Sequence, residues 1–347
     1  MNEIDIVIAG VGRFGALHAS VWAQAGARLV GACDPNEERL ADVARAHGVA
    51  ETATELAPLL ARLSPSVVVI ASDESTHASL ALIALEAGCH VFVEKPLALS
   101  AADAWTIQEA SARVGRHVVT GNISRFAMPY RRMRERLRAD AIGRLCALRL
   151  RRDFSRSWYA SFGDRVHPVW ESCIHDIDLA VSFTGAPVTR AMAMSSAAAG
   201  AAEPSVISAL LEFEGGATAT VESAWLVPDT APDTVSGSLE LEGTIAAEAE
   251  LLGLDGVIRQ RLLSDALVEW TTTGSRVPDL SLWPDEDGQV GGALRREVDY
   301  ALGVVTGQRA HDVIPLDEAC WGIAAAEAVE LALRTRQPVT VRSLAGG

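Results

Sequence analysis

The sequence predicts an α/β protein in two parts: a doubly wound parallel sheet, followed by a domain that combines helices with antiparallel strands. Strand-like and helix-like patterns alternate through the first third of the chain, a glycine-rich turn follows the first strand, and the pattern changes beyond Gly121. The length of 347 residues exceeds what one hydrophobic core usually supports. We therefore expect two domains, residues 1–122 and residues 123–347.

The strands predicted in the first part are short and apolar. Ile4–Ala9 leads into the glycine turn and a helix that ends near Ala25. Val67–Ala71 is apolar throughout, as expected for a parallel strand that is buried on both faces. The other strands are predicted at Leu29–Cys33, Val91–Val93 and His117–Thr120, and the other helices at Asn36–His47, Ser75–Ala87 and Ala101–Val114. This alternation implies right-handed βαβ crossovers and a parallel sheet.

The second part shows a different pattern. Leu145–Arg152 predicts a long strand, and Val206–Phe213 and Ala217–Ala224 are strands joined by Gly215-Gly216, a turn typical of antiparallel pairs. The remaining predicted elements are helices at Pro129–Leu137, Ala293–Val305 and Leu316–Arg334, and strands at Ser236–Leu241 and Val339–Val341. Helices and antiparallel strands in this order indicate an α+β domain.

The composition bears on partners and location. A formal net charge of -15 argues against nucleic acid and against an anionic membrane surface, because both attract basic proteins. No apolar run is long enough to span a membrane, and no basic segment precedes the first strand, so neither a membrane anchor nor a secretory signal is expected. The five cysteines are scattered without a CxxC pair, which is typical of reduced thiols in a cytoplasmic protein.

The turn Gly10-Val11-Gly12-Arg13-Phe14-Gly15 has the GxGxxG spacing of a dinucleotide site, and it lies between a predicted strand and a predicted helix. Gly10 permits the tight turn, Gly12 lets the backbone approach a pyrophosphate, and Gly15 lets the helix pack closely on the strand. The phosphates would then meet the N–H groups of the helix N-terminus. The alternative is an ordinary tight turn.

Asp34 ends the second predicted strand, 24 residues after Gly10. An acid at this place accepts hydrogen bonds from the adenosine ribose and repels the extra phosphate of NADP, so we expect a Rossmann domain that prefers NAD. Arg13 and Arg39 can offer positive charge to that phosphate, which keeps NADP as an alternative. Asp34 could instead be a helix N-cap before Pro35.

Glu94-Lys95-Pro96 directly follows a predicted parallel strand, at the carboxyl edge of the sheet where open α/β folds bind ligands. A lysine there can hydrogen-bond the oxygen of a reacting carbon and stabilise its alkoxide character. A surface Glu–Lys pair before a proline turn is the alternative.

Glu171 and His175 share one face, with Asp178 one turn beyond, if residues 171–178 form a helix. A histidine among acids suits a general base near neutral pH, and we expect the acids to favour its protonated form. The alternatives are a histidine held only for structure and a metal site. Because the spacing is not HExxH and His167 is poorly placed to complete a ligand set, no metal is expected.

Together these residues resemble the GFO/IDH/MocA family, which includes glucose–fructose oxidoreductase and inositol dehydrogenase. The resemblance covers nearly the whole chain: the turn at 10–15, the run Gly88–Leu97, Arg125-Phe126, Ile142-Gly143, His175–Asp178 and Arg296–Tyr300. It implies that the C-terminal α+β domain has a large, mainly antiparallel open sheet, which in relatives often forms oligomer contacts. A homo-oligomer, either a dimer or a tetramer, is therefore expected.

The resemblance also implies roles for single residues. Lys95 and His175 are the expected catalytic pair, with Glu171 beside them where inositol dehydrogenase-like members usually have aspartate. The expected cofactor-binding residues are Gly10, Gly12, Arg13, Phe14, Gly15, Asp34, Arg39, Ser72, His77, Glu94 and Lys95. An approach rich in arginine and aromatic side chains suits a sugar; the expected substrate-binding residues are Arg125, Trp158, Arg165, His167, Trp170 and Asp178.

The expected activity is NAD-dependent transfer of hydride between nicotinamide and a secondary hydroxyl or ketone of a cyclic polyol, a sugar or a sugar derivative. His175 would take the hydroxyl proton, and Lys95 would steady the oxygen. An imine or keto-sugar reductase of the same fold is one alternative, because it needs the same two residues. A non-catalytic NAD-binding regulator is another, although a regulator has no need for Lys95 and His175.

Overall fold

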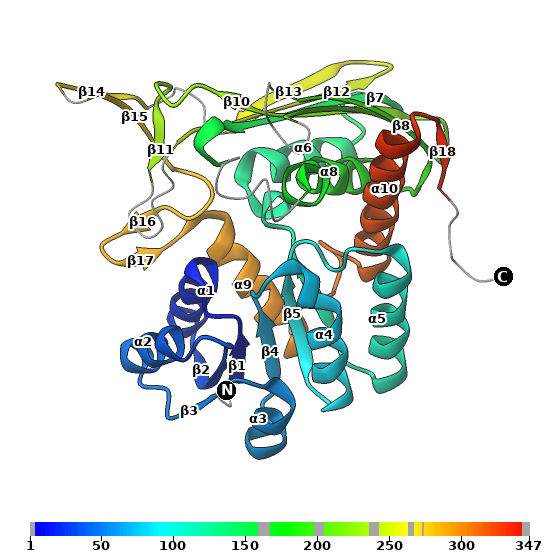
Figure 1. The fold of residues 1–347 in the computed structure, drawn as a ribbon. Helices are drawn as coiled ribbons and strands as arrows, with labels where there is room; N and C mark the ends of the chain where they lie inside the picture. Colours follow the sequence, from blue (N-terminus) through cyan, green and yellow to red (C-terminus); the bar gives the residue numbers. More distant parts are fainter. Residues whose placement is uncertain are drawn as a thin grey trace.

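The computed structural model describes residues 4–158, 167–197, 205–235, 243–262, 267–272 and 274–341. Figure 1 shows a parallel sheet flanked by helices, a broad second sheet, and a layer of helices between the two sheets. In the described ranges, none of the helices combines the length and the apolarity needed to cross a lipid bilayer.

The first sheet has six parallel strands in the order β3-β2-β1-β4-β5-β6. They are β1 (Ile4–Ala9), β2 (Ala27–Cys33), β3 (Glu51–Ala53), β4 (Val67–Ile70), β5 (His90–Glu94) and β6 (Val118–Gly121). Every neighbouring pair is parallel, which confirms the predicted doubly wound sheet. The strand order reverses between β1 and β4, so the ligand crevice of such a sheet lies at the carboxyl ends of these two strands.

The helices that connect these strands are α1 (Arg13–Gln24), α2 (Glu37–His47), α3 (Leu56–Leu63), α4 (His77–Glu86) and α5 (Ala101–Val114). α5 has the predicted bounds, because Ser100 caps it by accepting a hydrogen bond from the N–H of Asp103, and Gly115 ends it in the left-handed conformation. The sequence analysis missed β3 and α3. β3 is short and largely exposed, and α3 carries Pro58, which a helix accepts only in its first turn.

The second sheet has the order β13-β12-β7-β10-β9-β8-β18. Its strands are β7 (Leu145–Ser155), β8 (Val188–Ser196), β9 (Val206–Phe213), β10 (Thr218–Val227), β12 (Ile245–Gly253), β13 (Val257–Leu262) and β18 (Val339–Thr340). Neighbours are antiparallel except β7 and β10, so the mainly antiparallel sheet is confirmed. β8, β12 and β13 were not predicted from the sequence. β12 carries alanine at residues 246, 247 and 249, and alanine favours strands only weakly. The strand predicted at 236–241 lies outside the described residues.

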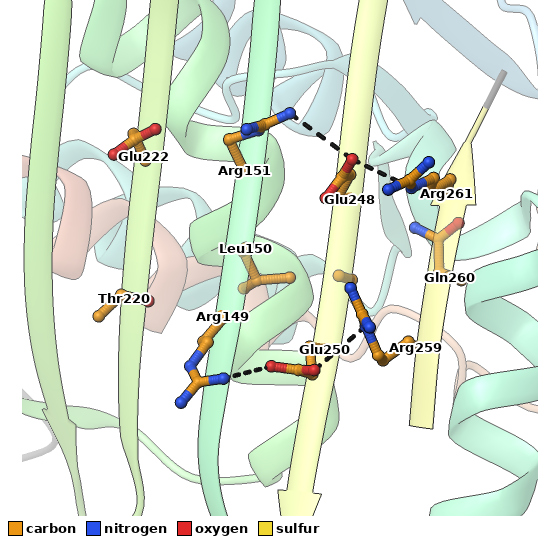
Figure 2. Close-up of a pocket in the computed structure, with 11 residues that line it drawn as sticks. Arg149, Leu150, Arg151, Thr220, Glu222, Glu248, Glu250, Arg259, Gln260 and Arg261 are labelled. Carbon is orange, nitrogen blue, oxygen red and sulfur yellow. Dashed lines mark hydrogen bonds and ion pairs between the residues drawn. The ribbon is translucent and has the colours of Figure 1, made fainter. Parts of the chain in front are cut away.

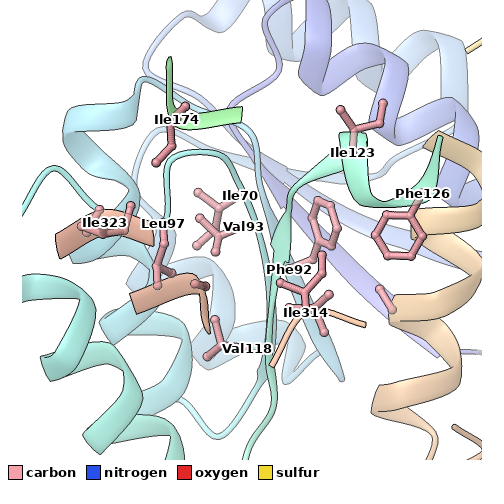
Figure 3. Packing of buried hydrophobic residues seen from close by; sticks show 14 of the residues in the cluster. Ile70, Phe92, Val93, Leu97, Val118, Ile123, Phe126, Ile174, Ile314 and Ile323 are labelled. Carbon is pink, nitrogen blue, oxygen red and sulfur yellow. The ribbon is translucent and has the colours of Figure 1, made fainter. Parts of the chain in front are cut away.

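Helices α6 (Met128–Arg138), α8 (Ile174–Thr184) and α10 (Leu316–Thr335) lie between the second sheet and the parallel sheet, and α9 (Gly292–Val305) packs beside α1 (Figure 1). One apolar core runs through both parts. Figure 3 shows Val93 and Leu97 of the first part together with Ile174 and Ile323 of the second, and all four belong to one buried cluster. The two parts are therefore joined by packed side chains as well as by the chain itself.

Two small sheets complete the described structure. One contains β11 (Asp233–Val235), β14 (Glu269–Thr271) and β15 (Gly274–Pro278), and the other is the hairpin of β16 (Asp285–Glu286) and β17 (Gln289–Val290). The hairpin is fastened to α1, where the Gln24 amide donates to the carbonyl of Gly288 at 3.1 Å and accepts from the N–H of Val290 at 3.0 Å. Trp283 packs edge-on against Phe14 of α1, with ring centroids 5.7 Å apart.

Candidate active site

The glycine turn lies between β1 and α1, at the crevice where the strand order reverses. Gly10 has a φ of 86°, and a Cβ there would lie 2.4 Å from backbone atoms of Ser72. A Cβ on Gly15 would lie 2.1 Å from the carbonyl oxygen of Gly10. Beside Gly12, by contrast, the described residues leave open space, and no side chain caps α1. This open space and the unbonded N–H groups of the first turn fit a pyrophosphate.

Asp34 is buried at the end of β2, beside the glycine turn. Its carboxylate oxygens accept hydrogen bonds from the N–H of Val11 and the N–H of Asn36, both at 2.8 Å. Each oxygen keeps a second lone pair that a ribose hydroxyl can use. Asn36, rather than Asp34, caps α2. Arg13 and Arg39 are exposed at the first turns of α1 and α2, where both can approach a bound nucleotide.

His77 links the turns that follow β4 and β5. Its buried ring places Nδ1 2.7 Å from the carbonyl oxygen of Pro96 and Nε2 3.2 Å from that of Ser72. The Ser72 hydroxyl lies 2.7 Å from the hydroxyl of Thr76. His77 therefore fixes the backbone on both sides of the crevice, next to the turn that carries Lys95.

Lys95 is the single lysine of the chain, and it reaches from the edge of the parallel sheet to the second domain. Its Nζ lies 2.9 Å from Oε2 of Glu171 and 3.2 Å from the Glu171 carbonyl oxygen. The two side chains are 17% and 27% exposed, so water screens the ion pair only in part. The partly exposed position leaves Lys95 accessible to a ligand in the crevice.

The segment around Glu171 differs from the continuous α-helix that the sequence predicted. Residues Val169–Cys173 form a π turn, in which the N–H of Ile174 bonds the carbonyl of Val169, and α8 begins only at Ile174. π turns are rare in proteins, but those that occur are often found at functional sites. Here the turn carries the Glu171 carboxylate to Lys95.

His175 is the second residue of α8, and its side chain is partly exposed. Burial lowers the pKa of His175 well below its usual value, and the positive charges of Lys95 and Arg152 lower it further. The expectation that nearby acids favour the protonated form is therefore wrong. The physical reason is that each nearby acid already has a cationic partner. Glu171 pairs with Lys95, Asp176 with Arg152, and Asp178 with Arg125.

The two aspartate pairs are buried. Asp176 accepts from Nε and Nη2 of Arg152 at 3.1 and 3.0 Å. Asp178 accepts from Nε and Nη2 of Arg125 at 2.8 and 2.7 Å, and Arg125 also donates to the carboxylate of Glu318. The side chains of Arg125 and Asp178 are 1% and 4% exposed. The expectation that these two residues bind substrate is corrected, because their donors and acceptors are used inside the protein.

Of the other expected substrate residues, His167 and Trp170 belong to one turn, where the N–H of Trp170 donates to the carbonyl of His167 at 2.9 Å. Trp170 is buried and donates from Nε1 to Glu330 of α10 at 2.9 Å, so it holds the π turn against α10. His167 accepts the N–H of Val169 at Nδ1 and shapes the start of that turn. Trp158 packs against Phe154, with ring centroids 5.5 Å apart. Arg165 lies outside the described residues.

From the sequence, Arg152 was expected to belong to the arginine- and aromatic-rich approach that suits a sugar, and no role was predicted for Asp176 or Glu318. One signal was available for Arg152: Arg149 and Arg151 lie on the exposed side of β7, so the alternation of the strand places Arg152 on the buried side. Nothing local marks Glu318, whose partner is distant in sequence. Within the described ranges, no group of three or more His, Cys, Asp and Glu side chains is arranged to hold a metal ion.

The glycine turn, the buried acid after β2 and the lysine at the sheet edge define an oxidoreductase with a dinucleotide-binding Rossmann domain. A family model described as oxidoreductase family, NAD-binding Rossmann fold (GFO/IDH/MocA), matches residues 4–122, and the model of a GFO/IDH/MocA C-terminal domain matches residues 130–249. The chain belongs to the GFO/IDH/MocA family and is an NAD-binding oxidoreductase. The predicted family and cofactor are thereby confirmed.

Several similar proteins are named as inositol dehydrogenases. The scyllo-inositol 2-dehydrogenase (NAD(+)) of Bacillus subtilis is 30% identical over a region that covers 54% of this chain and 56% of that enzyme. Inositol 2-dehydrogenase 2 of Saccharopolyspora erythraea is 29% identical over 78% of this chain and 85% of that enzyme. The scyllo-inositol dehydrogenase of Lactobacillus casei, solved with NAD(H) and scyllo-inositol, has a TM-score of 0.83 at 22% identity over 98% of this chain and 99% of that one, which shows the same fold.

Proposed function

We propose that this protein oxidises a secondary hydroxyl of a cyclic polyol, a sugar or a sugar derivative to the ketone, and catalyses the reverse reduction. The observation that carries the proposal is the placement of Lys95 and Glu171 in contact, at the edge of the NAD-binding sheet, with the Lys95 charge acting on His175. The names of the relatives support the substrate class, because the two curated relatives described above are inositol dehydrogenases.

NAD⁺, when bound, supplies the hydride acceptor. The neutral ring of His175 accepts the proton of the substrate hydroxyl, while the carbon gives up its hydride and the C–O bond becomes C=O. The ammonium of Lys95 hydrogen-bonds the same oxygen and stabilises the negative charge that develops there. Glu171 holds Lys95 in position through their ion pair.

For the cofactor, we propose that the turn at Gly10, Gly12 and Gly15 binds the pyrophosphate and that Asp34 binds the adenosine ribose. The open space at Gly12 and the remaining lone pairs of Asp34 support these roles. We propose Arg13, Phe14, Arg39, Ser72, His77 and Glu94 as the surrounding residues.

The test is the appearance of reduced nicotinamide on incubation with NAD⁺ or NADP⁺ and a panel of inositols, aldoses and related sugars. In the reverse direction, it is the consumption of added NADH or NADPH with keto-sugars. The wild type should turn over at least one panel member with NAD⁺. Lys95→Ala and His175→Asn should each lose at least about a hundredfold in kcat, while Arg45→Ala on the exposed side of α2 should keep full activity. Retained NAD binding in the inactive variants separates catalysis from folding. Wild-type NAD binding without turnover of any member would contradict the polyol assignment and favour an imine reductase or a regulator.

We also propose that the protein is a homo-oligomer, a dimer or a tetramer, that associates through the outward face of the second sheet. Figure 2 shows charged side chains across β7, β12 and β13, where Glu250 bridges Arg149 and Arg259, and Glu248 bridges Arg151 and Arg261. Exposed apolar side chains continue this face on β8 and β9: Met192, Met194 and Leu210.

A face with an apolar end and matched charges of both signs suits a copy of itself. Met194→Asp should reduce the mass measured by light scattering during size-exclusion chromatography, whereas the surface control Arg45→Asp should not. An unchanged mass for Met194→Asp would place the interface elsewhere.

We further propose a domain boundary after residue 122 and a cytoplasmic location. The first family match ends at residue 122, directly after β6, which supports the boundary. All five cysteines are free thiols, and four of them are buried, which supports a reducing compartment.

A further inference from the structure

Glu297 is a buried acid to which the reaction proposed above gives no role. It lies on the face of α9 that packs into the protein, beside the apolar residues Leu294, Val298 and Ala301. Its exposure is 0%, and neither carboxylate oxygen has a hydrogen-bond partner in the part of the chain that the structure describes. A carboxyl group at such a place costs free energy unless it is neutral and finds a partner.

Two side chains of α1 also have a buried nitrogen without a hydrogen-bond partner in the described part of the chain. His18 and Trp22 lie one helical turn apart, both at 0% exposure, and their rings pack on Phe92 of β5 at centroid distances of 5.2 and 5.6 Å. His18 Nδ1 and Trp22 Nε1 have no partner among the described residues, although His18 Nε2 lies 2.6 Å from Oε1 of Glu94. α1 also packs against α9, the helix that carries Glu297.

Glu94 connects this place to the catalytic lysine. Its Oε2 accepts a hydrogen bond from the N–H of Lys95 at 3.2 Å. On its other side the carboxylate packs against Gly121 at the end of β6, where a Cβ would lie only 2.8 Å from it. The position of Glu94 therefore sets the position of the strand end that carries Lys95.

Burial first, and nearby charge second, decide the protonation state of Glu297. Burial raises the pKa of Glu297 well above its usual value, and the carboxylates of Glu94 and Asp178 raise it further. Glu94 faces it from β5 and Asp178 from α8, and Asp178 is already paired with Arg125. His18 of α1 is paired with Glu94, since its Nε2 lies 2.6 Å from Oε1 of that carboxylate. Two ionised carboxylates cannot share such a site, so one proton is retained there.

We propose that Glu297 is a positioning residue: as a neutral carboxylic acid it shares its proton with Glu94, and this buried acid–carboxylate pair, braced by His18, fixes the strand end that carries Lys95. No bond to carbon forms or breaks in this step, and the proton stays within the pair. The inference rests on the proposed function only where turnover is the readout.

The first test compares Glu297→Gln with Glu297→Met, which has a similar size. The glutamine amide can donate to Glu94 as the acid does, whereas methionine cannot. We expect a kcat within about twofold of wild type for Glu297→Gln and a loss of at least about tenfold for Glu297→Met, with little change in the KM for NAD⁺. Equal losses in the two variants would overturn the proposal.

The second test follows stability against pH, and it does not depend on turnover. Because the folded state keeps a proton that the unfolded chain loses above its ordinary pKa, wild type loses stability relative to Glu297→Gln as the pH rises from about 5 to 8. One retained proton changes the ratio of the two folding constants by about tenfold per pH unit. The infrared carbonyl band of a protonated carboxylic acid should be present in wild type and absent in Glu297→Gln. Parallel stability curves together with an unchanged infrared spectrum would overturn the proposal.

The third test reads the position of Lys95 directly. Since the chain has one lysine, selective labelling with [¹³C]lysine gives a single set of side-chain signals. These signals should coincide in wild type and Glu297→Gln and should shift or broaden in Glu297→Met. A Glu297→Met spectrum identical to that of wild type would overturn the positioning role. If every protein is inactive on the substrate panel but these signals behave as expected, the proposed function fails and the positioning role stands.

Discussion

The Nζ of Lys95 lies 2.9 Å from Oε2 of Glu171, although the two residues are 76 positions apart and belong to different parts of the fold. Lys95 is held by the end of β5, and Glu171 is held by the π turn before α8. The contact therefore joins the NAD-binding sheet to the domain that carries His175. It also explains how glutamate serves at this position, since the longer side chain reaches the lysine from the π turn.

Glu171→Gln should lower kcat by about tenfold to a hundredfold, because Lys95 loses the counter-charge that fixes its direction toward the substrate oxygen. The kcat of Glu171→Asp should lie between that of wild type and that of Glu171→Gln, because the aspartate side chain keeps the charge but is shorter by one methylene. Steady-state kinetics with the best substrate of the panel would measure both effects. NAD affinity should stay unchanged, since the glycine turn is not altered. A Glu171→Gln enzyme as active as wild type would show that Lys95 needs no such support.

Asp34→Asn should reduce the preference for NAD over NADP by about tenfold to a hundredfold in kcat/KM. The asparagine can still accept a hydrogen bond from the N–H of Val11 or Asn36, but it no longer repels a 2′-phosphate. Adding Arg39→Ala should remove part of the gain in kcat/KM with NADP, because it removes a positive charge that the 2′-phosphate can approach. Arg39 lies exposed in the first turn of α2. An unchanged cofactor ratio in Asp34→Asn would place the discrimination at another residue.

The Arg152–Asp176 pair should control the pH at which the enzyme loses activity in acid. His175 must be neutral to accept a proton, and the nearby Arg152 charge helps to keep it so. Arg152→Gln leaves Asp176 negative and should move the acidic limb of kcat/KM to higher pH by about one unit, whereas Asp176→Asn leaves Arg152 positive and should move it to lower pH.

The double variant Arg152→Gln/Asp176→Asn is the control, and its pH profile should lie close to that of wild type. Each single change breaks a buried ion pair and costs about 3–5 kcal/mol of stability, so circular dichroism must show folded protein at the assay temperature. Shifts of the two single variants in the same direction would contradict this electrostatic role.

The sequence could predict those parts of the site that depend on local pattern. The GxGxxG turn and Lys95 follow short buried strands, and parallel strands bring such residues to one edge whatever the rest of the fold does. The partners of Arg125 and Trp170 could not be predicted in this way. Arg125 meets Glu318 across 193 positions and Trp170 meets Glu330 across 160, so only tertiary packing decides that these side chains face inward.

The alternation of apolar and polar residues also failed to predict a strand where alanine takes the place of larger apolar residues. β12 alternates buried alanine with glutamate, a pattern that a helix could share, and its place in the sheet is decided by pairing with β7. The π turn at Val169–Cys173 is a similar case. Its sequence fits an α-helix, and the hydrogen bonds of Trp170 and Ser172 with other elements favour the wider turn.

A histidine cluster should make the fold sensitive to acid. The rings of His90 and His117 stack with centroids 5.4 Å apart, and His117 meets His311 at 5.8 Å. Burial, followed by the charges of Arg116 and His117, lowers the pKa of His90 to about 4. Burial, followed by the charge of His117, lowers the pKa of His311 to about 4. His90 and His311 therefore bind protons less readily when the protein is folded than when it is unfolded.

Because the unfolded chain takes up these protons below pH about 6.5, stability should fall as the pH drops from 6.5 toward 4. His311→Phe keeps an aromatic ring in the cluster but removes the titration, so its melting temperature should fall less than that of wild type over this range. Arg116→Gln should act in the same direction, because it removes a charge that lowers the pKa of His90. Melting curves at half-unit pH steps would measure the difference. If both variants follow the wild-type curve in parallel, the acid sensitivity comes from other groups.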